Sequence, residues 1–287
     1  MNIAFIGFGE AGRSFTDSLQ AGGAHSIAAF DRRQDDEMAE AMRSRNVRAA
    51  RDPSDAVSGA DWIIAAVTAD ESLNAAQSVA PALEQGQIYF DINSVSPGRK
   101  RDSAELIEGR NAQYIDMAVM APVHPRGHAT PILLGGAGAE ELAPALTSAG
   151  FKLEVVGDAP GDATAIKMVR SLFVKGLEAI TVEAMLAARA SGAFEKVLAS
   201  LSNSYPGLGW PDIVGYNFER TLRHGKRRAA EMRESAATLD ALGLNGGLAA
   251  EIARVQDAMG QLPLDDMPEG DTADAIAQVL KARHDAQ

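Results

Sequence analysis

The N-terminal residues combine an apolar run with closely spaced glycines, a pattern that could hold the phosphates of a nucleotide. Residues 2–6 resemble a short buried strand, and the turn that follows them is a G-x-G-x-x-G. In such a turn the first glycine makes the tight bend, the second lets the backbone approach a pyrophosphate, and the third lets the next helix pack closely on the strand. The start of that helix adds unpaired N–H groups and a positive dipole end. We therefore predict a dinucleotide site here rather than a glycine turn that binds nothing. The candidate contacts are Gly7, Phe8, Gly9, Glu10, Ala11 and Gly12.

A second apolar run, residues 27–30, ends on an acidic residue, Asp31, nineteen positions after Gly12. A carboxylate at this point accepts a hydrogen bond from the ribose 2′-hydroxyl of NAD and repels the 2′-phosphate of NADP. Arg32 and Arg33 follow directly and could instead clamp that phosphate. The residues thus leave both cofactors open and favour NAD.

Further polar residues follow other apolar runs that resemble buried strands, at 62–67, 87–91, 113–116, 131–134 and 152–156. Ligands of open α/β sheets bind at the carboxyl ends of the strands. We expect Val67 and Thr68 near the nicotinamide, Asn93 and Ser94 at the substrate, with Asn93 also near the cofactor, and Met120 in a third loop.

The alternation of strands and helices predicts a doubly wound, mainly parallel sheet of the Rossmann type over residues 1–160. Strand signals stop near Gly157, and residues 161–287 predict an all-α domain that begins with a long interdomain helix from Asp162 to about Ser191. Proline and glycine clusters at 206–211, 243–247 and 263–268 break the later helices.

The long helix is apolar around much of its circumference. Its main stripe, at three- and four-residue steps, contains Ile166, Val169, Phe173, Leu177, Ile180 and Ala184. Four further apolar residues lie off that stripe: Met168, Leu172, Val174 and Met185. Because one surface helix needs only one apolar face, we expect a partner subunit to cover the second set, which predicts a homodimer.

Lys167 lies near the start of this helix, flanked by apolar residues, with Ser171 four positions on and on the same face. Partial desolvation lowers the pKa of a lysine and makes it a better general base. From the residues alone, a solvated lysine on an amphipathic helix is the simpler interpretation.

Over essentially its whole length the chain resembles the β-hydroxyacid dehydrogenase superfamily, which includes 6-phosphogluconate and 3-hydroxyisobutyrate dehydrogenases. It is most similar to a branch whose C-terminal half is a domain of unknown function. The substrate-loop motif matches Asp91, Asn93, Ser94 and Pro97, and the catalytic-helix motif matches Gly161 and Lys167. The resemblance implies that Lys167 is the catalytic acid and base. The family also has a lysine–aspartate pair near the nicotinamide. Here Arg227, Arg228 and Glu231 match this pair only approximately.

Two departures from the family motifs affect the expected substrate. Met120, Ala121 and Pro122 stand where the family has Ser-Gly-Gly, and Pro122 has no N–H to donate to a carboxylate. Ser171 replaces the usual asparagine four residues after the catalytic lysine. Both changes argue against an ordinary 3-hydroxy-carboxylate substrate, while the hydride chemistry is unaffected.

Two basic clusters could contact an anionic substrate. His124, Arg126 and His128 follow Pro122, and an arginine fork grips carboxylate or phosphate, although an exposed loop explains these residues equally well. Two histidines without a third ligand make a poor metal site, so we expect no metal. From the residues alone, the second cluster is expected to be a solvated helix face. The resemblance implies that part of it faces the crevice. It contains Arg220, Arg223, His224, Lys226, Arg227 and Arg228.

Composition excludes several classes of protein. The 287 residues carry a net charge of −12, which argues against nonspecific binding of nucleic acid or anionic membranes. The absence of cysteine excludes disulfides, thiol catalysis and thiolate metal sites. We find no signal peptide and no apolar run of the roughly 18 residues that a membrane span needs, and we expect a cytoplasmic protein.

Together these features predict an NAD(P)-dependent dehydrogenase that interconverts a small, acidic hydroxy compound and its carbonyl, with Lys167 moving the hydroxyl proton. An imine reductase-like enzyme shares the architecture, but such enzymes typically carry another residue at the position of Lys167. A non-catalytic dinucleotide-binding protein is the second alternative.

Overall fold

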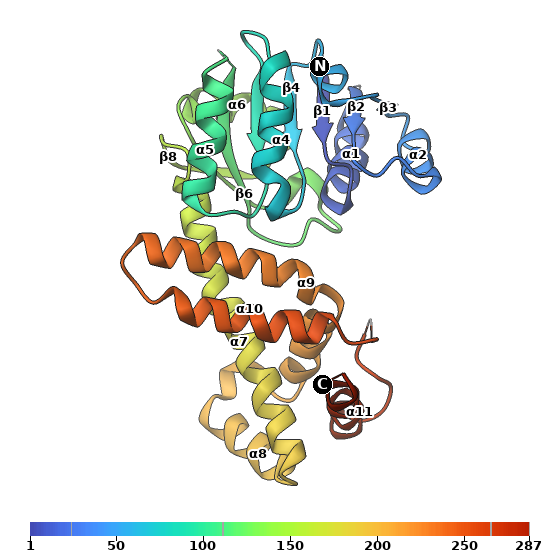
Figure 1. The fold of residues 1–287 in the computed structure, drawn as a ribbon, viewed down its shortest axis with the longest axis vertical. Coiled ribbons are helices and arrows are strands. Elements are labelled where there is room, and N and C mark those ends of the chain that lie inside the picture. The colour runs from blue at the N-terminus through green and yellow to red at the C-terminus, as the bar shows by residue number, and fades with distance from the viewer. Residues whose placement is uncertain (24, 111, 265, 287) are drawn as a thin grey trace. The chain divides into compact units, whose positions relative to one another are not determined.

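The computed structural model describes residues 1–23, 25–110, 112–264 and 266–286. The chain divides into two compact units, Met1–Met168 and Val169–Gln287. The first unit contains the sheet and its helices, and the second is helical (Figure 1). The predicted fold class, a Rossmann-type domain followed by a helical part, is confirmed.

One eight-stranded sheet, in the order β3-β2-β1-β4-β5-β6-β7-β8, forms the centre of the first unit. Every neighbouring pair is parallel except β6 and β7, which are antiparallel. The two-residue β3 has no apolar run and was not predicted. The strands are β1 (Asn2–Ile6), β2 (Ser26–Phe30), β3 (Arg48–Ala49), β4 (Trp62–Ala65), β5 (Ile88–Asp91), β6 (Gln113–Val119), β7 (Ile132–Gly135) and β8 (Leu153–Gly157).

Helices cover both faces of this sheet because its strands are apolar on both sides. Side chains of α1 (Glu10–Gly22), α2 (Asp36–Arg43) and α6 (Ala139–Ser148) join one buried cluster with the strands. Those of α3 (Pro53–Val57), α4 (Ser72–Val79) and α5 (Pro97–Glu108) join the other cluster, and α4 and α5 lie in front of the sheet in Figure 1. Short 3-10 turns lie at η1 (Ala69–Glu71), η2 (Ala80–Ala82) and η3 (Gly127–Ala129).

The strand register sets where the candidate site can form. One row of paired residues crosses β2, β1, β4, β5 and β6, and it consists of Phe30, Ile6, Ala65, Asp91 and Asp116. In β2, β1, β4 and β5 the residue of this row is the last residue of the strand. The loops that follow those strands therefore share one edge of the sheet, the edge at which open α/β folds bind ligands.

The helix α7 (Asp162–Ala190) starts at the predicted residue, but its first two turns belong to the first unit and the remainder to the second. The second unit continues with α8 (Phe194–Ser204), the 3-10 turn η4 (Pro206–Leu208), α9 (Asp212–Ala241), α10 (Gly246–Gly260) and α11 (Thr272–Asp285). The predicted breaks fall between these helices. Val182, Met185, Phe218, Met259 and Ile276 are among the side chains of its buried core.

The orientation of α7 differs from the prediction. Residues of the expected inner stripe face outward, with Phe173 73% and Ile180 67% exposed, whereas Met168 and Met185 are buried. The reason is that the inner face carries two charged residues that find partners. Lys175 pairs with Glu231 of α9, and Glu178 pairs with Arg228 of the same helix.

Candidate functional site

Two of the three glycines after β1 leave no room for a side chain, and the third borders open space. Gly7 has a φ of +91°, and a Cβ there would lie 2.4 Å from the Ala66 carbonyl oxygen. A Cβ on Gly12 would lie 2.8 Å from the Gly7 oxygen, so only glycine lets α1 pack this closely. Gly9 differs, because a Cβ there would meet no atom within 4 Å. The space beside Gly9 is therefore open at the sheet edge, as a bound phosphate requires.

The start of α1 is suited to an anion. Gly9 is the N-cap residue, and no side chain caps the helix, so the N–H groups of the first turn are not satisfied by a cap. Glu10 is exposed and Ala11 half-buried. The side chain of Phe8 is fully buried and packs edge-on against Phe5 with ring centroids 6.3 Å apart, so only its backbone faces the turn.

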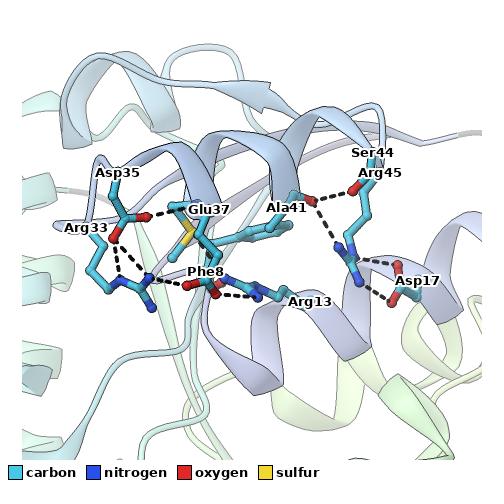
Figure 2. Close-up of polar contacts among 10 residues, drawn as sticks. Phe8, Arg13, Asp17, Arg33, Asp35, Glu37, Ala41, Ser44 and Arg45 are labelled. Atoms are coloured by element: carbon cyan, nitrogen blue, oxygen red, sulfur yellow. Dashed lines mark hydrogen bonds and ion pairs between the residues drawn. The ribbon is translucent and has the colours of Figure 1, made fainter.

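Two charged side chains brace the glycine turn through the backbone of Phe8. The Phe8 N–H donates to Asp31 Oδ2 at 2.7 Å. Arg13 Nε donates to the Phe8 carbonyl at 3.0 Å (Figure 2). The other Asp31 oxygen accepts the Arg33 N–H at 2.8 Å. Asp31 is therefore fixed by two backbone N–H groups, and each carboxylate oxygen keeps a second lone pair for a ribose hydroxyl.

The two arginines after Asp31 already have carboxylate partners. Arg33 donates to Asp35 Oδ2 at 3.0 Å and to Glu37 Oε2 at 2.9 Å (Figure 2). Arg32 pairs with Glu71 in the loop after β4, with Nη1 2.5 Å from Oε1. The sequence could not reveal that both guanidinium groups are paired.

Asn93 holds two loops together. Its Oδ1 accepts the Val67 N–H at 2.8 Å, and its Nδ2 donates to Ser72 Oγ at 3.4 Å. The side chain is buried. Asn93 therefore positions the loop of Val67, whereas we had expected it to point at substrate. Thr68, the next residue, is exposed.

A fully buried lysine, Lys100 of α5, lies between two carboxylates of the sheet. Its Nζ is 3.1 Å from Asp91 Oδ1 and 3.2 Å from Asp116 Oδ1, and it donates to the Asp91 carbonyl at 2.7 Å. All three side chains have no exposed surface. Tyr114 donates its hydroxyl to Asp91 Oδ2 at 2.9 Å, and burial, with the nearby carboxylates, raises the pKa of Tyr114 well above its usual value, so the hydroxyl remains a donor.

One of these carboxylates, that of Asp116, anchors the first turn of α7. Asp116 Oδ2 accepts the Thr164 N–H at 2.8 Å, and the Thr164 hydroxyl donates to the Val95 carbonyl at 2.7 Å. Lys167 lies one turn further along and is half-buried. The helix that carries the candidate acid and base is thus tied to the middle of β6 and to the loop after β5.

Sequence reasoning missed Lys100 because residues 99–102 look like a charged, solvated turn. The available signal is its spacing, since Lys100, Ala104 and Ile107 lie on one helix face, and all three are buried.

The remaining substrate candidates of the first unit lie in the loops after β5 and β6. Ser94 is half-buried, and its hydroxyl makes no hydrogen bond within the described residues. Met120 is half-buried, and its N–H donates to the Pro131 carbonyl at 2.9 Å. His124 and Arg126 are exposed.

His128, the third residue of the basic loop, is held by groups of the protein itself. Its ring is buried against Phe151, with Nδ1 2.7 Å from Ser18 Oγ and Nε2 3.1 Å from the Ala149 carbonyl. Burial lowers the pKa of His128, which favours the neutral ring. This residue attaches the loop after β6 to α1.

Ser171 and Glu231 belong to the second unit, where both are buried. Glu231 lies 2.7 Å from Lys175 Nζ and 3.1 Å from Arg227 Nη1. Arg223 of the basic cluster pairs with Glu219 at 3.2 Å. The carboxylates thus neutralise several of the cations that the sequence placed together.

Over the described part of the chain, no three His, Asp or Glu side chains are placed to hold a metal ion. Within the same residues, no helix has the length and apolar character to cross a bilayer.

Comparisons with known proteins match both parts of the chain. Residues 2–157 match the family described as the NAD-binding domain of 6-phosphogluconate dehydrogenase. Residues 188–259 match a domain of unknown function, DUF1932.

Solved structures match nearly the whole chain. A conserved hypothetical protein from Sinorhizobium meliloti 1021 is 34% identical, with 99% of this chain and 96% of that chain covered and a TM-score of 0.76. A conserved protein of unknown function, described as structurally similar to 3-hydroxyacid dehydrogenases, is 30% identical over 90% of this chain and 96% of its own, with a TM-score of 0.69. The 3-hydroxyisobutyrate dehydrogenase of Mycobacterium tuberculosis, solved with L-serine, shares the fold at 19% identity, 97% and 98% coverage and a TM-score of 0.75.

The buried lysine leads to a stability prediction. Lys100→Met keeps most of the side-chain volume but leaves Asp91 and Asp116 buried without their cation. Breaking a buried ion pair in this way costs about 3–5 kcal/mol. We expect the free energy of unfolding, measured by urea denaturation, to fall by that amount. The exposed neighbour Arg101 provides the control, because Arg101→Met should change stability by less than about 0.5 kcal/mol. Equal effects of the two substitutions would contradict the assignment.

A second prediction concerns pH. Burial is the main cause that raises the pKa of Asp116 above its ordinary value. Its ionised form is therefore less favourable in the folded than in the unfolded chain, and stability is lost as pH rises through the folded pKa. Asp116→Asn does not titrate and can still accept the Thr164 N–H. Between about pH 4 and 7, its unfolding free energy should rise relative to that of the unsubstituted protein. A difference that does not change with pH would contradict this.

Proposed function

Because the chain belongs to the family defined by the NAD-binding domain of 6-phosphogluconate dehydrogenase, we propose that it is an NAD(P)-dependent oxidoreductase. It interconverts a small, acidic hydroxy compound and the corresponding carbonyl compound. Lys167 is the general base in the oxidation and the general acid in the reduction.

The observation that carries this proposal is that one sheet edge provides both a dinucleotide cradle and a lysine. The cradle consists of the open backbone at Gly9, the uncapped start of α1 and the fixed carboxylate of Asp31. The first turn of α7 is anchored to Asp116 in the row of residues that ends β1, and Lys167 follows it by one turn. These features suit a nicotinamide dinucleotide.

In this proposal each of the chain's residues has a separate task. The α1 N-terminus binds the pyrophosphate, and Asp31 accepts a ribose hydroxyl. Asn93 fixes the Val67 loop beside the nicotinamide position. When bound, the nicotinamide accepts or donates the hydride. Lys167 takes the proton of the substrate hydroxyl, and such proton transfer contributes roughly 10²–10⁴-fold in rate.

The loops suggest the class of substrate. Pro122 offers no N–H to a carboxylate, whereas Arg126 and His124 are exposed on the segment that follows it. An arginine can grip a carboxylate or phosphate through its side chain. We therefore propose that Arg126 and His124 bind the acidic group and that Ser94 and Met120 line the substrate position.

The long helix suggests how the chain assembles. Val169, Phe173 and Ile180 project from α7 at helical spacing and are exposed. Burial of such an apolar stripe is favourable at roughly 25 cal/mol per Å². We propose that a second copy of this chain covers the stripe, which gives a homodimer through different residues from those first expected.

Catalysis can be tested at Lys167. Lys167→Met removes the proton acceptor and keeps most of the side-chain volume, so the chemical step should slow by roughly 10²-fold or more. Cofactor affinity and melting temperature should be unchanged. The measurement is nicotinamide reduction with a substrate found by screening hydroxy acids. Lys152→Met, an exposed lysine in the same unit, is the control. Full turnover by Lys167→Met would remove this residue from the mechanism, and reduction of imines alone would favour the imine reductase alternative.

Assembly can be tested by light scattering. The 30.2 kDa chain should have about twice that mass at micromolar concentration. Phe173→Glu places a charge in the stripe and should yield monomers, whereas Lys196→Glu, an exposed change on α8, should not. A monomeric unsubstituted protein would contradict the proposal.

A further inference from the structure

The ion pair between Arg32 and Glu71 connects two loops that lie on opposite sides of the glycine turn. Arg32 follows β2 and Glu71 ends η1, the turn after β4. In the sheet, β1 lies between β2 and β4. The pair therefore spans the carboxyl end of β1, from which the glycine turn starts.

Glu71 is well held in this position. Its Oε1 lies 2.5 Å from Arg32 Nη1, and its Oε2 accepts a hydrogen bond from Asn74 Nδ2 at 3.1 Å. The hydrogen bond from Arg32, followed by that from Asn74, lowers the pKa of Glu71, so the carboxylate is ionised at neutral pH. The guanidinium thus faces a fixed negative charge.

Neighbouring charges make this part of the site unfavourable for a 2′-phosphate. Asp31 cannot turn away from the ribose position, because both of its oxygens are held by backbone N–H groups. Arg33 pairs with two carboxylates, because its Nε and Nη2 donate to Asp35 and its Nη2 also donates to Glu37. Asp35 in turn caps α2 by accepting the Met38 N–H at 2.9 Å.

Arg32 is the cation that can still be recruited. Among the residues that the structure describes, Glu71 is the carboxylate that pairs with it, and the Arg32 side chain is 74% exposed. A 2′-phosphate beside the Asp31 carboxylate needs a compensating arginine. For Arg32 to bind that phosphate it must leave Glu71.

We propose that Glu71 is a specificity-determining residue. It holds Arg32 away from the ribose 2′-position and so lowers the affinity of this chain for NADP. This inference rests on the proposed binding of a nicotinamide dinucleotide. It adds that discrimination depends on competition between Glu71 and the 2′-phosphate for one guanidinium, and not on Asp31 alone.

The test is calorimetric titration of the full chain with NAD⁺ and NADP⁺. Glu71→Gln removes the negative charge and keeps an acceptor for Asn74. We expect NADP⁺ to bind up to about fivefold more tightly, the scale of a released surface ion pair, while NAD⁺ affinity does not change measurably. Adding Arg32→Gln to this variant should abolish the gain, because the gain comes from the freed guanidinium.

Glu37→Gln is the matched control, since it removes an equally charged carboxylate nearby but leaves Arg33 held by Asp35. It should leave the preference for NAD⁺ unchanged. An equal gain in Glu37→Gln, or no gain in Glu71→Gln while NAD⁺ still binds, would overturn the inference and leave the proposed function intact. Failure of the unsubstituted chain to bind either dinucleotide would overturn both.

Discussion

The contact on which the site depends is the burial of the Lys100 ammonium between Asp91 and Asp116. One cation cannot neutralise two carboxylates, so the remaining charge must be stabilised by dipoles. Asp91 accepts the Tyr114 hydroxyl and the Asn93 N–H, and Asp116 accepts the Thr164 N–H at the positive end of the α7 dipole. An interior charge is stable only while these donors stay in place, and so β5, β6, α5 and α7 are held in one arrangement.

Much of the architecture follows from simple rules. Continuous apolar runs identified seven of the eight strands, and proline and glycine clusters located the breaks between the later helices. The glycine turn was predictable because sterics at Gly7 and Gly12 allow no side chain. Asp31 was correctly located at the end of β2, but its bonds to the backbone at Phe8 and Arg33 depend on how the chain returns in space.

The errors share one physical cause. Lys100, Lys175 and Glu178 were not identified from the sequence, and they are buried because each has a partner from another element. Such partners are distant in sequence, and a single sequence does not reveal them. On α7 the face that packs inward carries the paired Lys175 and Glu178. The stripe with Phe173 and Ile180 lies on the opposite, exposed side, so the helix is oriented differently from the prediction.

The continuity of α7 restricts how this protein can vary. A helix advances 1.5 Å and turns 100° with each residue, and α7 passes from one compact unit to the next without interruption. An insertion or deletion between Thr164 and Leu177 would therefore rotate everything beyond it about the helix axis. Ordinary interdomain linkers absorb changes in length. A change of length inside α7 would therefore also change which of its residues face the buried core of the second unit.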